Sequence, residues 1–391
     1  MSNKKNSVFK NLIVLLMIFT MLAWMRSPVK AAEPLIIDHT CTDQSQIPEE
    51  WIESAKNNLH IVYQHTSHGS QLITGMNALE NFPEFGSKYE WSDNGASGLD
   101  LDDYGIPGCD DLSQGDWIDG NGVTPWVTVT KNLLDNPANS HVNVVILSWC
   151  SINMHNAQCY VDNMETLVSE YPDVTFVFMT GHAQGQGENL YDDPQPDGKG
   201  HVYYNNQLIR QHCIDNKRVL FDFADIEAYD PDGNYYWNLT MLDNLDYSGG
   251  NWGTEWCDDN IGSEFEQLTT GNGVSGYSGC GSCAHSGSLG AANTINCVLK
   301  GRACWWLWAK LAGWNSNGCL CDLNHDSKCD MEDWLLLGED WGRTNCGTPP
   351  GSGNPPNDCK CDMNNDGRCD MQDWLLFGDD WGRTDCPCSL N

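Results

Sequence analysis

The chain has 391 residues, 54 of them acidic and 20 basic, which gives a formal net charge of −34. A surface this negative repels phosphate groups, so we expect no binding of nucleic acid or of an anionic membrane. The charge suits an exported protein that handles neutral or cationic substrates and calcium. The length leaves room for one large domain and one small domain.

The N-terminus has the pattern of a secretory signal peptide. Lysines precede an apolar stretch at 12–25, and Ala31 and Ala32 offer small residues for cleavage. The apolar stretch is short for a retained membrane span. We therefore expect residues 1–32 to be a signal peptide and the mature protein to have no integral membrane segment. It would be secreted and extracellular, either free or within a cell-surface complex.

The chain contains 19 cysteines, ten before residue 318 and nine after it. Cysteines of exported proteins mostly form disulfides, because the compartment is oxidising. We therefore expect most of the first ten to be paired. An odd total leaves at least one cysteine outside any pair within the chain, and the spacing leaves the pairing itself open.

Apolar runs alternate with amphipathic stretches, which predicts a parallel β-sheet with helices on both faces. The expected strands lie at 60–63, 142–147, 174–179 and 219–223. The expected helices lie at 71–82, 126–134, 160–170, 203–216 and 298–311. Two stretches rich in Gly and Asp, at 84–125 and 224–297, are predicted loop insertions that line a functional face. The predicted fold class is α/β, a three-layer, flavodoxin-like arrangement.

Polar residues follow the predicted strands at Ser67, Asn153, His182 and Asp222. Ligands of parallel sheets bind at the carboxyl ends of the strands, where these residues would gather. Ser67 lies between a strand and a helix N-terminus, whose free N–H groups could hold an oxyanion formed by attack of the hydroxyl on an acyl carbon. The alternative is that Ser67 only caps the helix.

The C-terminal part contains an internal repeat. Residues 319–346 align without gaps on residues 359–386, with 19 identities in 28 positions, and a Gly- and Pro-rich linker separates the two copies. Each copy contains the pattern Asp-x-Asn-x-Asp-x-x-x-Asp-x-x-Asp. Calcium takes six to eight oxygen ligands, which loop positions 1, 3, 5, 7, 9 and 12 supply at this spacing. The repeat therefore predicts two calcium loops.

Twelve residues are the predicted calcium ligands. They are Asp322, Asn324, Asp326, Lys328, Asp330 and Asp333 in the first loop, and Asp362, Asn364, Asp366, Arg368, Asp370 and Asp373 in the second. The basic residue at position 7 of each loop would contribute its backbone carbonyl. Gly367 provides the sharp turn at position 6 of the second loop, whereas Ser327 stands there in the first loop, which we expect to bind calcium more weakly.

The two loop–helix units resemble a type I dockerin. The resemblance covers about the last 70 residues and predicts a small α-helical, EF-hand-like domain at 316–391. It implies attachment to a cohesin-type domain of a scaffold in a polysaccharide-degrading system. Each repeat also carries four cysteines, which ordinary dockerins lack and which could brace the loops as disulfides.

The large domain, at 33–315, resembles the SGNH (GDSL-like) hydrolases in the order of its elements. The resemblance implies that Ser67 is the nucleophile and that His285, just before the last helix, is its base. Asn153 and Gly115 match the oxyanion residues, and His182 could touch substrate. No further cofactor is needed for this chemistry.

Two motifs of that family are absent here. The turn reads His-Thr-Ser-His-Gly instead of containing Gly-Asp-Ser, and Ser282 stands three residues before His285, where the family has Asp. The carboxylate that orients His285 would then come from elsewhere, with Asp222, Asp225 and Asp258 as candidates.

The favoured prediction is a serine esterase that removes acyl groups from polysaccharides. A metal-dependent hydrolase is one alternative, with zinc on His65, His68, His182 and His285. A non-catalytic glycan-binding module is another. A glycoside hydrolase is a third, with its carboxylate pair drawn from Glu188, Asp192, Asp193, Glu227 and Asp230.

Overall fold

The computed structural model describes most of the large domain and parts of the repeat region. The described residues are 34–109, 112, 124–184, 200–286, 291–314, 321, 323, 328–343, 361, 368–379 and 381. They fall into two compact units. Unit 1 runs to Gln44 and continues from Lys56 to Leu307; unit 2 contains Ser45–Ala55 and the chain from Trp308 onward. Among the described residues, no helix is both long enough and apolar enough to cross a membrane. The predicted signal peptide at 1–32 lies outside them.

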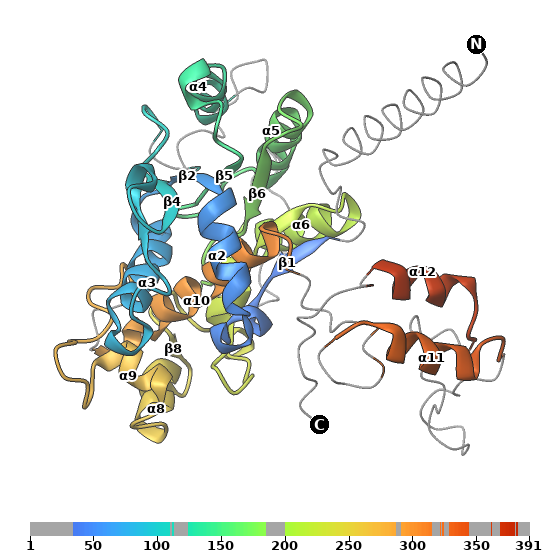
Figure 1. Ribbon diagram of the computed structural model, residues 1–391. Helices are drawn as coiled ribbons and strands as arrows, with labels where there is room; N and C mark the ends of the chain where they lie inside the picture. Colours follow the sequence, from blue (N-terminus) through green and yellow to red (C-terminus); the bar gives the residue numbers. More distant parts are fainter. Residues whose placement is uncertain are drawn as a thin grey trace, which may run out of the picture. The chain divides into compact units, whose positions relative to one another are not determined.

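Unit 1 is built on a seven-stranded sheet with the strand order β1-β7-β6-β5-β2-β4-β3 (Figure 1). The strands are β1 Leu35–Ile37, β2 His60–Gln64, β3 Trp91–Ser92, β4 Leu99–Asp103, β5 Val144–Leu147, β6 Thr175–Met179 and β7 Val219–Phe221. Every neighbouring pair is parallel. The predicted parallel α/β sheet is thus confirmed.

The sheet is wider than the sequence indicated. The four predicted strands are present as β2, β5, β6 and β7. The stretch 84–125, predicted to be a loop insertion, contains β3 and β4, and that part of the prediction is wrong. β3 has only two residues, and β4 alternates leucine with aspartate, so neither gives a continuous apolar run.

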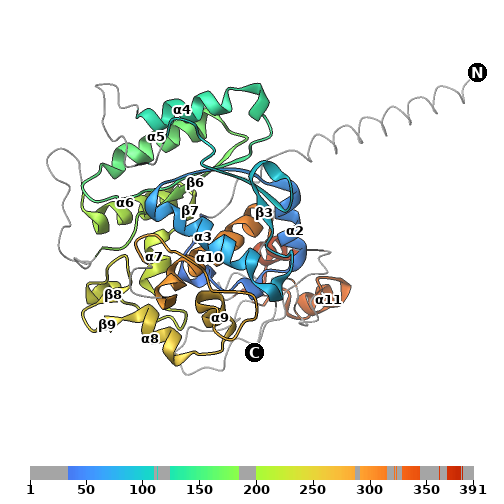
Figure 2. The ribbon, with the colours of Figure 1, turned by 90° about the vertical axis from the view of Figure 1, so that its left-hand side faces the viewer.

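Helices flank the sheet in a three-layer arrangement, with α4, α5 and α6 on one face and α3 and α10 on the other (Figure 2). Their bounds lie within three residues of the predicted ones: α3 Ser70–Asn81, α4 Pro125–Leu134, α5 Ala157–Glu170, α6 Val202–Asp215 and α10 Ile295–Leu311. A further helix, α2, spans Glu49–Asn58. The described part of the insertion at 224–297 contains regular structure as well as loops. Its α-helices and strands include α7 Phe223–Ala228, α8 Trp252–Asp259, α9 Glu264–Thr270, β8 Asp246–Tyr247 and β9 Gly250–Asn251.

Helices α3 and α10 touch backbone to backbone at two glycines. A Cβ atom added to Gly75 would overlap the carbonyl oxygen of Cys297, and one added to Gly301 would overlap the backbone of Gly75. Side chains at these positions would push the helices apart. Since α3 begins just after Ser67 and α10 follows the segment that carries His285, the contact sets the spacing of these two segments.

Unit 2 contains α11 Met331–Asp340 and α12 Met371–Asp379, which follow the two predicted calcium loops. Their small core is built from the same positions of both repeats: Cys321, Leu323, Cys329 and Leu337 with Cys361, Cys369 and Phe377. Backbone hydrogen bonds join the repeats, from Gly342 N to Cys369 O at 2.9 Å and from Cys369 N to Arg343 O at 2.9 Å.

The described cysteines form three disulfides. Cys321–Cys329 and Cys361–Cys369 each bridge one predicted calcium loop, which agrees with the expected bracing, and Cys283–Cys297 lies in unit 1. The prediction that most of the first ten cysteines are paired is wrong. Eight of them are thiols: Cys41, Cys109, Cys150, Cys159, Cys213, Cys257, Cys280 and Cys304. Most of these thiols are buried in the apolar interior, where cysteine packs as a small hydrophobic residue.

The glycine contact leads to a stability prediction. We expect Gly75→Ala to lower the free energy of unfolding of unit 1 by about 1–3 kcal/mol, because the added methyl group forces backbone shifts in a packed core. The measurement is urea unfolding of the full chain. The matched control is Gly338→Ala in α11, where an added Cβ meets no atom within 4 Å, and this substitution should be neutral or stabilising. Equal effects of the two substitutions would contradict the prediction.

Candidate functional site

Ser67 lies on a strained turn at the carboxyl end of β2. It begins the one-turn helix η3 (Ser67–Gly69), which leads directly into α3, and its φ angle is 45°. Left-handed backbone is unfavourable for a residue with a Cβ atom, and such strain concentrates at functional sites. A side chain at Gly69 would overlap Ser148 at the end of β5. The turn that carries Ser67 therefore packs closely against the end of the neighbouring strand β5.

His285 approaches this turn from a loop 218 residues later in the sequence. Its Nε2 and Ser67 Oγ form a hydrogen bond, so the contact expected between these two side chains is present. The His285 backbone has a φ angle of 62°. Two links hold its loop: the Cys283–Cys297 disulfide, and a 2.5 Å hydrogen bond from Gln71 Nε2 to the carbonyl of Ala284.

Asp243 brings a carboxylate next to this pair, and sequence reasoning did not find it. Asp243 Oδ2 lies 3.8 Å from His285 Nδ1 and 3.0 Å from His68 Nε2. Two of the three candidates named from the sequence pair elsewhere: Asp222 bonds Arg210, and Asp225 bonds His39. Asp258, the third, lies at the end of α8. Asp243 lies in the loop before β8, inside an insertion without periodicity, and nothing in its neighbouring sequence marks it.

Three imidazoles stack in a row above the carboxyl edge of the sheet. His68 lies in the middle, with ring centroids 3.7 Å from His285 and 4.1 Å from His182. Burial lowers the pKa of His68 to about 4 and outweighs its hydrogen bond to Asp243. Burial alone would raise the pKa of Asp243, but the hydrogen bond from His68 and the adjacent imidazoles lower it. At neutral pH His68 is therefore neutral and donates its Nε2 proton to an ionised Asp243.

The other predicted site residues take separate places. Asn153 Oδ1 is 3.1 Å from His201 Nδ1, and its oxyanion role stays a prediction. His182 Nδ1 lies 2.8 Å from the carbonyl of Ala183, in addition to the stacking on His68. His65 Nε2 lies 2.6 Å from Asp103 Oδ1, and this histidine is in none of the candidate metal clusters of the described residues. Gly115 lies outside the described residues.

A fully buried ion pair is connected by hydrogen bonds to two loops of the site. Lys300 Nζ on α10 lies 2.8 Å from Glu227 Oε2 on α7, and both side chains have no exposed area. Glu227 also accepts the backbone N–H of Ala183, next to His182. Asn296 bonds both Lys300 and the carbonyl of Asp243. One buried network thus connects the loops that carry two site residues, and it makes Glu227 unsuitable as a glycosidase carboxylate.

A cavity of about 310 Å³ opens at the same edge of the sheet, beyond β7 and β1. Its lining combines aromatic rings with charged groups: Tyr203, Tyr229, Tyr235, Trp237, Arg210, Asp38, Asp222 and Asp225. Flat rings beside hydrogen-bonding groups suit a ligand with both apolar faces and hydroxyl groups.

Three clusters of the described residues could hold a metal ion, each with its ligand atoms within 4.8 Å of one another. They are His68–Cys150–His285, His68–His182–Asp243 and Asp38–His39–Asp225. The first two share His68 and lie at the Ser67 site.

The repeat region is described only in part. Of the twelve predicted calcium ligands, Lys328, Asp330, Asp333, Arg368, Asp370 and Asp373 are described, and the other six lie outside the described residues. The carboxylate of Asp333 is buried and accepts the backbone N–H groups of Leu323 and Asp330, at 2.8 and 2.9 Å. Asp373 accepts the N–H of Asp370 in the same way, at 2.8 Å. Both carboxylates are thus fixed at the loop ends, while calcium binding stays a prediction.

Helices α11 and α12 present an apolar groove of about 360 Å³. Its lining contains Met331, Trp334, Trp374, Phe377, Gly378 and Trp381. The three tryptophans are 44–46% exposed, which is unusual for such large apolar side chains and is typical of an interaction surface.

Comparison with known proteins does not place the chain in a family: no protein-family model matches it, and no curated protein or solved structure is significantly similar. Functional inference therefore depends on the geometry of the site.

The buried ion pair leads to a prediction about the support of the site. Lys300→Met should lower the free energy of unfolding by about 3–5 kcal/mol, because it leaves the Glu227 carboxylate buried without a countercharge. Adding Glu227→Gln removes that charge and should restore at least half of the loss. Urea unfolding of the two single variants and the double variant measures this coupling. Strictly additive losses would show that the two groups do not depend on each other.

Proposed function

We propose that unit 1 is a serine hydrolase, an esterase that removes acyl groups from glycans. The observation that carries this proposal is the hydrogen bond between Ser67 and His285, with Asp243 behind the imidazole. A hydroxyl, an imidazole and a carboxylate in that order are what activates a serine for attack on an acyl carbon. These three residues come from distant segments of the chain and meet at one edge of the sheet. A serine that only capped a helix would not require such a meeting, so the capping role is the weaker interpretation.

The proposed mechanism follows from the positions of these groups. His285 Nε2 takes the proton from Ser67 as the hydroxyl attacks the ester carbonyl. It then gives that proton to the sugar oxygen as the ester C–O bond breaks, which leaves the acyl group on Ser67 and releases the sugar as an alcohol. Asp243, ionised and held by His68, stabilises the imidazolium. The leading N–H groups of η3 have no partner within that helix, and they would donate hydrogen bonds to the oxyanion. Water then releases the acyl group by the same route in reverse.

The cavity beyond β7 supports a sugar as the alcohol part of the ester. Tyr203, Tyr229 and Tyr235 are partly exposed and offer rings and phenol hydroxyls to a pyranose. Arg210 and Asp225 offer polar partners for its hydroxyls. The negative net charge of the chain disfavours acidic glycans. A neutral, acylated plant polysaccharide fits both observations.

The esterase proposal is tested with a chromogenic acetyl ester and an acetylated glycan. Ser67→Ala should lower turnover by at least about a thousandfold, because it removes the nucleophile. Asp243→Asn should lower it strongly with little change in KM, since the interaction acts in the transition state. The control is Ser140→Ala, another turn serine, located before β5 at the opposite end of the strands, which should keep full activity. Activity that survives Ser67→Ala would refute the proposal.

We further propose that unit 2 is a dockerin-like module that binds calcium and attaches the enzyme to a cohesin-type scaffold. The repeated ligand spacing supports calcium, and the exposed tryptophan groove supports a protein partner. The disulfides across the loops would keep the chain close to its calcium-bound shape. A non-catalytic module delivered in this way remains the alternative if no acyl substrate is turned over.

Calcium should stabilise unit 2, because a ligand that binds only the folded state shifts unfolding by mass action, about 2.7 kcal/mol at a hundred times Kd. Calorimetry of the full chain with calcium, and then with chelator, should show one transition that moves while that of unit 1 stays. Asp362→Ala should reduce this shift more than Asp322→Ala, since Ser327 already weakens the first loop. A melting profile indifferent to both calcium and chelator would exclude the calcium sites.

A further inference from the structure

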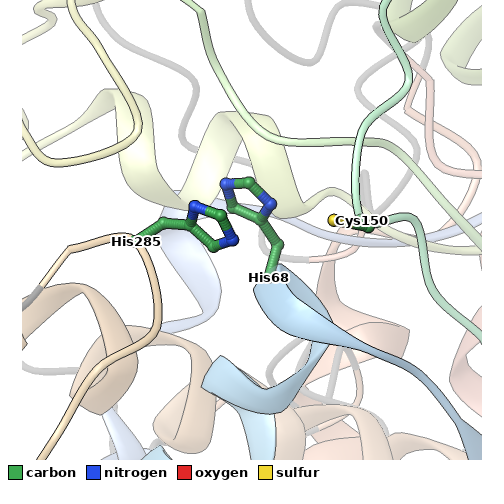
Figure 3. A group of neighbouring side chains, drawn as sticks. All are labelled: His68, Cys150 and His285. Carbon is green, nitrogen blue, oxygen red and sulfur yellow. The ribbon is translucent and has the colours of Figure 1, made fainter.

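Three side chains with metal-binding atoms converge beside the Ser67–His285 hydrogen bond. His68 comes from η3, Cys150 from the loop after β5, and His285 from the loop after α9 (Figure 3). A nitrogen of each histidine and the Cys150 sulfur all lie within 4.8 Å of one another. Zinc bonds nitrogen and sulfur at about 2.0–2.3 Å in a tetrahedral arrangement, so ligands this close need only a small inward movement to share one ion.

His68 is oriented as a metal ligand. Its side chain is only 5% exposed, and Nε2 is bonded to Asp243 at 3.0 Å. The other nitrogen, Nδ1, is buried and has no hydrogen-bond partner among the residues that the structure describes. Zinc-bound histidines commonly donate the N–H of one ring nitrogen to a carboxylate and bind the metal through the other nitrogen. A buried acceptor without a donor is costly, and a metal ion would satisfy it.

We propose that His68, Cys150 and His285 bind zinc or a similar borderline divalent cation, and that this ion inhibits the hydrolase reversibly. The site differs from the four-histidine zinc centre considered from the sequence, because it uses Cys150 and excludes His65. Two imidazoles and one thiolate favour zinc over the hard cations calcium and magnesium.

Inhibition follows from the chemistry of His285, and this part of the inference rests on the proposed esterase function. A neutral imidazole has one nitrogen with a free lone pair. A metal ion that takes this lone pair leaves none to accept the proton of Ser67. Zinc binding and proton transfer therefore exclude each other, although both depend on the orientation of the histidine rings beside Asp243.

The site is tested first without any reference to activity. Full-length protein in excess calcium is titrated with Co²⁺ and followed by absorption spectroscopy, because a thiolate charge-transfer band and tetrahedral ligand-field bands identify the ligands of the ion. A second titration, with Zn²⁺, is followed by calorimetry. We expect one site per chain in unit 1 with a thiolate band. Cys150→Ala should abolish the band and weaken zinc binding at least tenfold. Cys213→Ala removes a different buried thiol, on α6, and should change neither.

Ser67→Ala separates this inference from the proposed function. The variant should keep the cobalt spectrum and bind zinc at least as tightly as the wild type, because the competing hydrogen bond is gone. In the wild type, zinc should suppress ester hydrolysis and chelator should restore it. The rate of each variant is compared with its own rate in the absence of metal. By this measure, inhibition of Cys150→Ala should require at least ten times more zinc than inhibition of the wild type.

The two proposals can fail separately. Absence of a thiolate band, or zinc binding unchanged by Cys150→Ala, overturns the metal site even if Ser67 proves catalytic. Zinc that raises the rate overturns the inhibitory role. A cobalt spectrum that depends on Cys150, in a protein that hydrolyses no ester, upholds the metal site and overturns the esterase.

Discussion

The contact between α3 and α10 is the constraint on which the site depends. A serine can pass its proton to an imidazole only across a hydrogen bond, and Ser67 and His285 are 218 residues apart. Gly75 and Gly301 let the two helix backbones touch, so the segments before them meet at one point. The Cys283–Cys297 disulfide and the Gln71 hydrogen bond then fix the short loop that carries His285. A displacement of 1 Å in such a pair can cost a hundredfold in rate.

The buried pair of Lys300 and Glu227 performs a second kind of positioning. Removing two charges from water costs several kcal/mol each, and hydrophobic replacements of such pairs are often as stable. Stability alone therefore does not explain the pair. What hydrophobic side chains could not do is bind the N–H of Ala183 and, through Asn296, the carbonyl of Asp243. We infer that the pair fixes the positions of the two loops that carry His182 and Asp243.

The sequence predicts the parts of this arrangement that have local signals. Apolar runs locate β2, β5, β6 and β7, and the strand-to-helix turn identifies Ser67. His285 could be matched through a resemblance in element order. Asp243 could not, because its role depends on how a long insertion folds back over the sheet. The thiols escaped prediction for a similar reason: whether two cysteines meet depends on tertiary structure, and most of these are buried as apolar side chains.

The same orientation would serve the two proposed chemistries, ester hydrolysis and zinc binding, which cannot operate together. Asp243 is bonded to His68 Nε2, which leaves Nδ1 of that ring on the side of Cys150, and it also lies 3.8 Å from His285, the proposed base. Calcium would not compete for the group of His68, Cys150 and His285, because it prefers oxygen ligands and this group offers nitrogen and sulfur. The two proposed metals would thus be separated by ligand type within one chain. Calcium would govern attachment and zinc would govern turnover, so that each could change without the other.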